Sequence, residues 1–156
     1  MDIDRLDRRI LTLLQENNRI ANVDLAAEVG LSAPACFKRV KRLREANIIV
    51  GDVSIINSEL VGNKITLIVS VEMERDRGDI YSVFRQSIMQ APEVTQCYQI
   101  TGGYDFMLVI SVADIRSYEK FIERVLHQDK NIRKFQTSVS TKTVKFSTQV
   151  NVEELP

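Results

Sequence analysis

A chain of 156 residues has room for one ordinary domain or two small ones, and 44% hydrophobic with 27% charged residues excludes disordered, collagen-like and coiled-coil classes. The first ten residues carry frequent charges, and no window approaches the roughly 18 uninterrupted apolar residues of a membrane span. We therefore expect a cytoplasmic protein without a membrane segment.

Residues that usually build metal or catalytic centres are sparse. Cys36 and Cys97 lie far apart without a CxxC or Cys/His pattern, so we interpret both as buried thiols, with redox sensing by Cys36 as the alternative. The lone His127 has no second ligand nearby and is interpreted as a helix-terminal or interface histidine. Neither a P-loop, a Rossmann fingerprint nor a Ser-His-Asp elbow is visible, so we expect no enzyme, metal site or cofactor.

The formal net charge of zero conceals an uneven distribution. Residues 32–47 hold five cations against the single acid Glu45. The cations are Lys38, Arg39, Lys41, Arg42 and Arg44. The basic character of the chain is therefore concentrated on one segment.

Three helices are predicted before residue 50. The first helix has apolar residues at helical spacing. Asp4 precedes them as a predicted N-cap, and Asp7 follows three residues after Asp4. The second runs from Asn22 as N-cap and stops at Gly30, and Ser32 then caps a third helix with Pro34 in its first turn. Two helices joined by a tight Gly-containing turn predict a helix-turn-helix in residues 1–50.

The third helix carries an apolar side and a cationic side, as a recognition helix requires. Cys36, Val40 and Leu43 suit packing on the other helices, and the opposite stripe is Ala35, Lys38, Arg39 and Arg42. We expect this stripe to face double-stranded DNA, with Ser32 and Lys41 helping to hold phosphates. The alternative is a solvated basic helix, which the preceding short helix and Gly turn disfavour.

The second half is predicted to be an α/β domain. Residues 48–57 read as a β segment broken at Gly51, and we take residues 51–63 as a linker. Residues 64–156 then show a strand from Ile65, a helix from Asp79, strands over 94–101 and 104–112, a helix after Asp114, and a long polar strand over 132–146.

The order βαββαβ is that of a ferredoxin-like unit, so the overall fold class is α+β. Its sheet is expected to be antiparallel, with both helices on one face. The other, free face carries few charges and is a candidate oligomer surface.

Several collinear motifs carry a resemblance across nearly the whole chain. They are Leu6-Asp7-Arg8-Arg9-Ile10-Leu11, Leu13-Leu14-Gln15, Arg19-Ile20, Leu25-Ala26, Val29-Gly30-Leu31-Ser32, Arg39-Val40-Lys41-Arg42-Leu43 and Thr101-Gly102-Gly103-Tyr104-Asp105-Phe106. In this order and spacing the sequence resembles the Lrp/AsnC (leucine-responsive, feast/famine) family of transcriptional regulators.

The resemblance implies a helix-turn-helix followed by a RAM- or ACT-like domain. It also implies a homodimer that commonly assembles into octamers, binds a free amino acid between dimers near the Gly-x-x-Asp loop, and controls genes of amino-acid metabolism. Four positions depart from the usual pattern: Arg44, Asn47, Asp52 and Ser58. Asn47 still suits a helix stop because Asn tolerates the left-handed conformation, whereas Asp52 puts the packing of the linker in doubt.

The expected effector site is Thr101, Gly102, Gly103, Tyr104 and Asp105, together with Ser138 of the polar closing strand. Glycines permit close approach of backbone groups to a ligand, and Asp105 points away from the side shared by Tyr104 and Phe106. The alternative is a tight hairpin turn that Gly-Gly satisfies without any ligand.

Three function classes follow from these patterns: a ligand-responsive DNA-binding regulator, an architectural chromatin-like DNA binder, and an amino-acid-binding enzyme subunit with an incidental helical domain. The first is favoured. The effector, the operator, the sign of regulation and the size of the assembly are not encoded in any motif.

Overall fold

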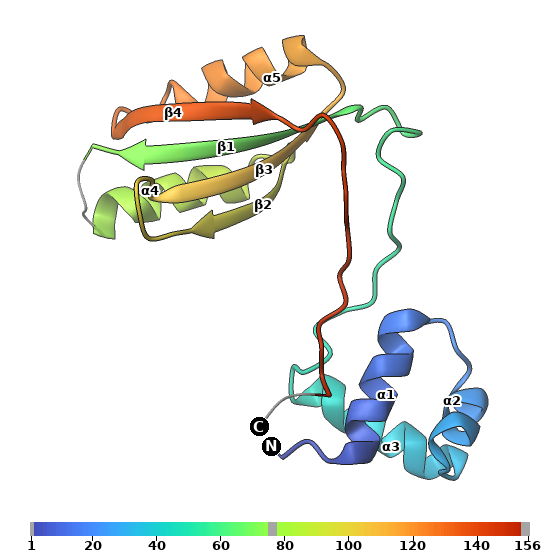
Figure 1. Ribbon diagram of the computed structural model, residues 1–156. Coiled ribbons are helices and arrows are strands. Elements are labelled where there is room, and N and C mark those ends of the chain that lie inside the picture. Colours follow the sequence, from blue (N-terminus) through green and yellow to red (C-terminus); the bar gives the residue numbers. More distant parts are fainter. Residues whose placement is uncertain (1, 75–77, 154–156) are drawn as a thin grey trace. The chain divides into compact units, whose positions relative to one another are not determined.

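The computed structural model describes residues 2–74 and 78–153, which form two compact units (Figure 1). A helical unit contains residues 2–54 together with residues 145–153, and an α/β unit contains residues 55–74 and 78–144.

The helical unit consists of α1 (Arg5–Glu16), α2 (Asn22–Val29) and α3 (Ala33–Glu45), as the sequence predicted. The helices meet around a core in which Ile10, Cys36 and Leu43 are fully buried. Asp4 and Asp7 form a reciprocal capping box at the start of α1, and Gly30 ends α2 in the left-handed region at φ 71°. Asn47 also adopts positive φ, 55°, after α3.

The start of α2 differs from the prediction. Ala21 occupies the N-cap position, and Asn22 is the first helical residue. The Asn22 side-chain amide instead donates a hydrogen bond of 2.8 Å to the carbonyl of Ala33, so it ties α2 to the beginning of α3. Ser32 stands at the predicted N-cap position of α3, but its hydroxyl makes no capping hydrogen bond.

A segment that follows the α/β unit returns to the helical unit and docks on α1. The Gln15 side chain donates to the Val150 carbonyl at 3.1 Å and accepts from the Val150 N–H at 2.7 Å. Arg8 donates to the Val152 carbonyl at 2.7 Å, and the Val152 side chain packs against the helical core. Residues 145–153 are therefore part of the helical unit.

The α/β unit has the predicted order, with β1 (Ile65–Met73), α4 (Gly78–Met89), β2 (Val94–Gln99), β3 (Phe106–Val112), α5 (Ile115–Phe121) continued by the π-helical η1 (Ile122–Leu126), and β4 (Ile132–Val139). The strands lie in the order β2-β3-β1-β4 and all neighbouring pairs are antiparallel. The α+β fold class is thereby confirmed. Strand β4 ends at Val139, so the prediction of a strand reaching Phe146 is wrong.

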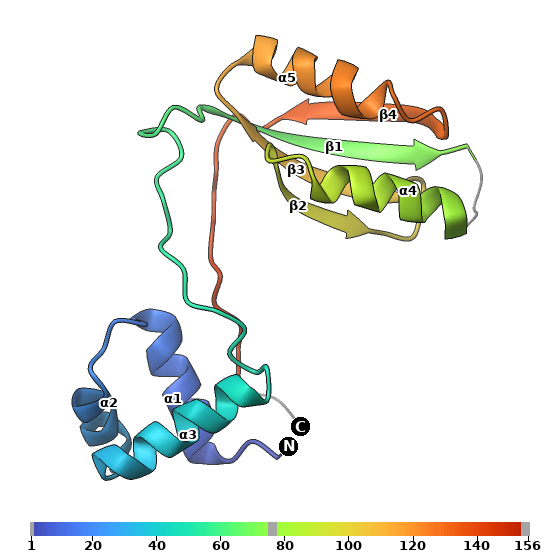
Figure 2. The same ribbon diagram turned by 180° about the vertical axis from the view of Figure 1, so that it is seen from behind.

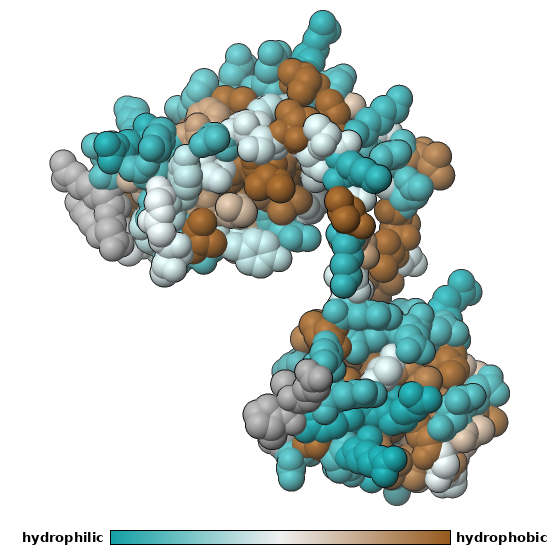
Figure 3. All heavy atoms as spheres, in the orientation of Figure 1, coloured by the Kyte–Doolittle hydropathy of each residue, from teal (hydrophilic) through white to brown (hydrophobic). Residues whose placement is uncertain are grey.

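Alternation along the strands separates a core face from an open face. Phe106, Leu108, Ile110 and Val112 of β3 are buried beneath α4 and α5, which cover the same side of the sheet (Figure 2). On the other side, Ile68 lies between Val109 and Ser138 of its neighbouring strands. Figure 3 shows apolar patches in the middle of this open face among more polar surroundings.

The predicted β segment over residues 48–57 is not a strand in the single chain. The N–H groups of Ile48 and Ile49 bend back to the Leu43 carbonyl at the end of α3, and no neighbouring segment in the described chain gives residues 50–57 the hydrogen bonds that define a ladder. Apolar side chains remain in solvent here, with Val50 89% and Val53 73% exposed.

The Asp4 cap generates a pH-dependent prediction. The Asp7 N–H bond and then the Arg39 guanidinium hold the pKa of Asp4 below its ordinary value of 3.8. Because the pKa is depressed in the folded state, Asp4 contributes stability above its unfolded-state pKa, and this is lost as the pH falls through the folded pKa. We expect Asp4→Ala to lower the free energy of unfolding by about 0.5–2 kcal/mol at neutral pH, measured by urea denaturation.

The difference in free energy of unfolding between wild type and Asp4→Ala should become smaller as the pH is lowered below 3.8. Asp2→Ala, at an exposed acid outside the helix, is the matched control and should leave stability nearly unchanged. A difference that stays constant with pH would contradict the charged role of Asp4.

Candidate DNA and effector sites

The outward face of α3 is defined by burial. Cys36 and Leu43 point into the helical core, whereas Lys38 and Lys41 are exposed. Two further exposed residues, Pro34 and Phe37, fall at helical spacing with these lysines. The exposed stripe of α3 is therefore Pro34, Phe37, Lys38 and Lys41.

Arg39 and Arg42 lie on the flank of α3 that meets α1, where they surround a buried carboxylate. Asp7 has no exposed surface and accepts from Arg39 at 2.9 Å and from Arg42 at 2.5 Å. Arg39 also pairs with Asp4 at 2.6 Å. The hydrogen bonds from Arg39 to Asp4 and Asp7 raise the pKa of its guanidinium.

This cluster, formed by Asp4, Asp7, Arg39 and Arg42, fixes α3 against α1. The Arg39 side chain is only 26% exposed, whereas that of Arg42 is 47% exposed and keeps a free edge toward solvent. Of the other residues expected at the DNA, Ser32 is exposed and Ala35 is half-buried. Contact of Arg39 and Arg42 with DNA stays a prediction, as does that of Ser32, Ala35, Lys38 and Lys41.

Sequence reasoning missed Pro34 and Phe37 on the outward face. The available signal was that Phe37 does not follow the apolar spacing of Cys36, Val40 and Leu43, although it is the largest apolar residue of α3. An aromatic residue away from the apolar seam of a helix is expected in solvent.

The loop between β2 and β3 contains most of the expected effector residues. The Ile100 N–H donates to the Asp105 carbonyl at 2.8 Å, which closes the loop, and Gly102 adopts a φ of 129°. Thr101, Gly102 and Gly103 are exposed. The loop thus has the geometry of a glycine-dependent hairpin turn, and its exposed backbone is open to a ligand.

Asp105 is more firmly tied to the fold than its sequence suggested. Its Oδ2 accepts from the Met73 N–H at 2.7 Å, and its Oδ1 accepts from the Tyr81 hydroxyl. Its backbone N–H donates to the Val71 carbonyl at 2.9 Å. Asp105 therefore joins the loop to the end of β1 and to α4.

Tyr104 links the same loop to β4. Its hydroxyl donates to the Gln136 side chain at 2.7 Å, and the ammonium of Lys134 lies 5.6 Å from the centre of its ring. Ser138 follows Gln136 on the same face of β4 and is exposed. Gln136 and Lys134 were missed, because only the three-dimensional pairing of the loop with β4 reveals them.

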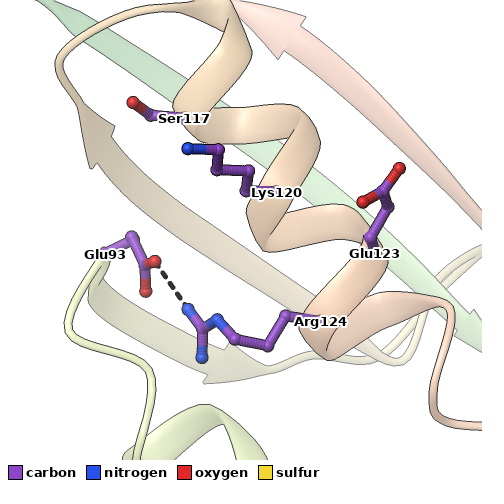
Figure 4. Close-up of a pocket in the computed structure, with 5 residues that line it drawn as sticks. All are labelled: Glu93, Ser117, Lys120, Glu123 and Arg124. Atoms are coloured by element: carbon purple, nitrogen blue, oxygen red, sulfur yellow. Dashed lines mark hydrogen bonds and ion pairs between the residues drawn. The ribbon is translucent and has the colours of Figure 1, made fainter.

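Another polar hollow lies beside α5, between the turn before β2 and the outer side of the helix (Figure 4). Its lining consists of Glu93, Ser117, Lys120, Glu123 and Arg124. Arg124 pairs with Glu93 across it at 2.5 Å, so the most basic group is already neutralised. Glu93 precedes β2, at the end of the β2–β3 pair opposite to the loop that joins these two strands.

The cysteines and the histidine have different surroundings. Cys36 is buried, and burial raises the pKa of its thiol, which favours an unreactive role. Cys97 is exposed on the edge strand β2, so the expectation that it is buried is wrong. His127 follows η1 directly and lies 5.9 Å from the Phe135 ring. It is therefore a helix-terminal histidine.

Within residues 2–74 and 78–153, no helix is long and apolar enough to cross a membrane. The same residues contain no group of three or more His, Cys, Asp or Glu side chains that could hold a metal ion.

Comparison with known protein families matches both units. Residues 3–50 match the winged helix-turn-helix DNA-binding model, and residues 66–150 match the Lrp/AsnC ligand binding domain. An uncharacterized HTH-type transcriptional regulator of Sinorhizobium fredii is 40% identical over 98% of this chain and 90% of its own length. The leucine-responsive regulatory protein of Haemophilus influenzae is 33% identical over 92% of this chain and 86% of its own length.

Solved structures agree over the same extent. A transcriptional regulator of Neisseria meningitidis in complex with L-Met has a TM-score of 0.89 and 30% identity, with 96% of both chains covered. An AsnC family transcriptional regulator of Agrobacterium tumefaciens has a TM-score of 0.89 and 31% identity, covering 94% of this chain and 95% of that one. With its helix-turn-helix and its four-stranded α/β unit in the same order, the chain belongs to the Lrp/AsnC family of transcriptional regulators, which are not enzymes.

Proposed function

We propose that this regulator binds specific double-stranded DNA through α3 and changes its activity when a free amino acid binds the α/β unit, with genes of amino-acid metabolism as its targets. The observation that carries the proposal is the exposed stripe of α3, where Lys38 and Lys41 stand beside small or apolar groups on a helix held firmly against its own domain. The proposed place of action is the cytoplasm.

Lys38 and Lys41 supply the charge for the DNA contact. Both ammonium groups are on the outward face, and Lys41 is 62% exposed while its nearest acid, Glu45, lies 3.7 Å away. Such a separated, exposed pair contributes little, so DNA phosphates can replace the carboxylate. Arg42 can offer its free edge to a base or a phosphate without giving up Asp7.

The effector is proposed to be a free amino acid held at Thr101, Gly102, Gly103, Tyr104 and Asp105, with Ser138 contributing. Exposed loop N–H groups can bind a carboxylate, and hydroxyl, amide and carboxylate oxygens nearby can accept from an ammonium group. The Neisseria relative was solved with L-Met, which supports a small amino acid as the class of ligand.

A homodimer, assembling further to an octamer, is proposed from surfaces that a single chain leaves unsatisfied. Residues 50–57 expose Val50, Val53 and Ile55 and have no backbone hydrogen bonds within the described chain, and the open face of the sheet presents Ile68 at 39% exposure. Burial of such surfaces between copies would remove apolar area from water and pair the linker backbone.

An architectural DNA binder without an effector is the second candidate. The observation in its favour is that both carboxylate oxygens of Asp105 already have partners in the fold, so the contacts of Asp105 need no ligand to explain them. The glycines before it are likewise explained by the turn that they form. Such a protein would bind DNA with the same salt dependence but would ignore amino acids.

The DNA contact is tested with Lys38→Ala and Lys41→Ala. Each change should reduce the slope of log Kd against log salt by about one if that side chain neutralises one phosphate. Fluorescence anisotropy with a duplex from the region upstream of the gene measures the slope. Lys120→Ala, on α5, is the control and should leave it unchanged; unaltered slopes in both α3 variants would remove α3 from the interface.

The effector is tested by thermal shift against the twenty amino acids, followed by sedimentation. A ligand that binds the native state raises the apparent melting temperature, by an amount that corresponds to about 2.7 kcal/mol at a hundredfold excess over Kd. The same amino acid should shift the assembly state and alter DNA affinity, because coupled binding equilibria act in both directions. A protein that binds DNA but responds to none of the twenty would be the architectural candidate.

Asp105→Ala separates the structural role of the loop from its role in sensing. Loss of the acceptor leaves the Met73 N–H and the Tyr81 hydroxyl without that partner, so the free energy of unfolding should fall by about 1–3 kcal/mol. The amino-acid response should also be lost under conditions in which the variant is still folded.

Tyr118→Phe is the matched control for this experiment. It removes another buried tyrosine hydroxyl, which makes a 2.5 Å hydrogen bond with the Thr137 hydroxyl on the helix-covered side of the sheet. We expect comparable destabilisation with the response preserved. A full response in folded Asp105→Ala would exclude Asp105 from the sensor.

A further inference from the structure

We propose that Phe37 is a specificity-determining residue of this regulator and recognises the C5-methyl group of thymine in the major groove. The inference rests on the proposed function, since it needs α3 to enter DNA, and it assigns to one side chain a preference for one base.

Phe37 is placed on the surface where the helix would meet a partner. The Phe37 side chain is 59% exposed, whereas Cys36, which precedes it, and Leu43, further along the helix, are fully buried in the core. Pro34 and Lys41, one turn before and one turn after, are exposed as well, and so is the adjacent Lys38. The phenyl ring therefore belongs to the outward stripe and not to the packing of the helical unit.

The charges around the ring indicate the kind of partner. Lys38, Lys41 and Arg42 share the exposed part of α3 with it, and Glu45 is the only acid of the helix. These cations favour a polyanionic partner. An apolar protein surface would remove water from the cations without supplying opposite charges in exchange. An aromatic ring inserted among lysines thus suits a surface that is anionic at its edges and apolar at one point.

The major groove of DNA has this combination. Phosphates line its edges, and thymine is the one base that presents an apolar group, the C5-methyl, to the groove floor. A phenyl ring has no hydrogen-bonding group and cannot read the polar edges of adenine, guanine or cytosine. Contact with the methyl removes apolar surface from water, and one such group changes affinity about fourfold for each recognition helix that meets a thymine.

The experiment uses the full chain and duplexes that it selects from a random-sequence library. Each selected duplex is prepared twice, with thymidine and with deoxyuridine, which differ by the methyl group alone. We expect wild type to bind the deoxyuridine duplex about fourfold more weakly per recognition helix, whereas Phe37→Ala should bind both duplexes equally, at the weaker affinity.

Phe146→Ala is the matched control, because Phe146 is a phenylalanine of the helical unit with a similar exposure of 61%. It should retain the full thymidine-to-deoxyuridine ratio, and Phe37→Leu should retain part of it. Equal affinities of wild type for the two duplexes, or the same ratio in wild type and Phe37→Ala, would overturn the role of Phe37 while leaving DNA binding in place. Failure to select any duplex above non-specific, salt-dependent binding would instead overturn the proposed sequence-specific function.

Discussion

The helical unit depends on one buried carboxylate. Asp7 lies in α1 without exposed surface and receives the N–H of Asp4 and the guanidinium groups of Arg39 and Arg42 from α3. A buried charge is costly unless its oxygens are satisfied, so the position of α3 relative to α1 is restricted to arrangements that keep both arginines on Asp7. The same contact turns these arginines toward α1 and leaves Lys38, Lys41 and Phe37 to form the outward stripe.

Local patterns were sufficient to predict most of the elements. The alternation from Ile65 to Met73 and the buried residues of β3 defined two strands, because one face of the sheet is covered and the other is not. Gly30 and Asp4 marked helix ends because their conformational and capping preferences act within a few residues. The order of the α/β unit then followed from the chain itself.

What could not be predicted depends on partners distant in sequence. Asp7 looked like a capping residue, and nothing local indicated that it binds Arg39 and Arg42. Asp105 looked available to a ligand until its contacts with Met73 and Tyr81 were seen. The polar strand was extended too far because residues beyond Val139 have strand-like composition, whereas a strand also needs a neighbour to pair with.

The docking of residues 145–153 on α1 has a consequence for the order in which the protein is made. Topologically, the α/β unit is an insertion between two parts of the helical unit. During synthesis the three helices emerge first, but Val150 and Val152 leave the ribosome only after the whole α/β unit has been translated. The helical unit therefore cannot complete its folding before the α/β unit has been synthesised. One side of α1 in the nascent helix-turn-helix therefore stays uncovered until the α/β unit has been translated.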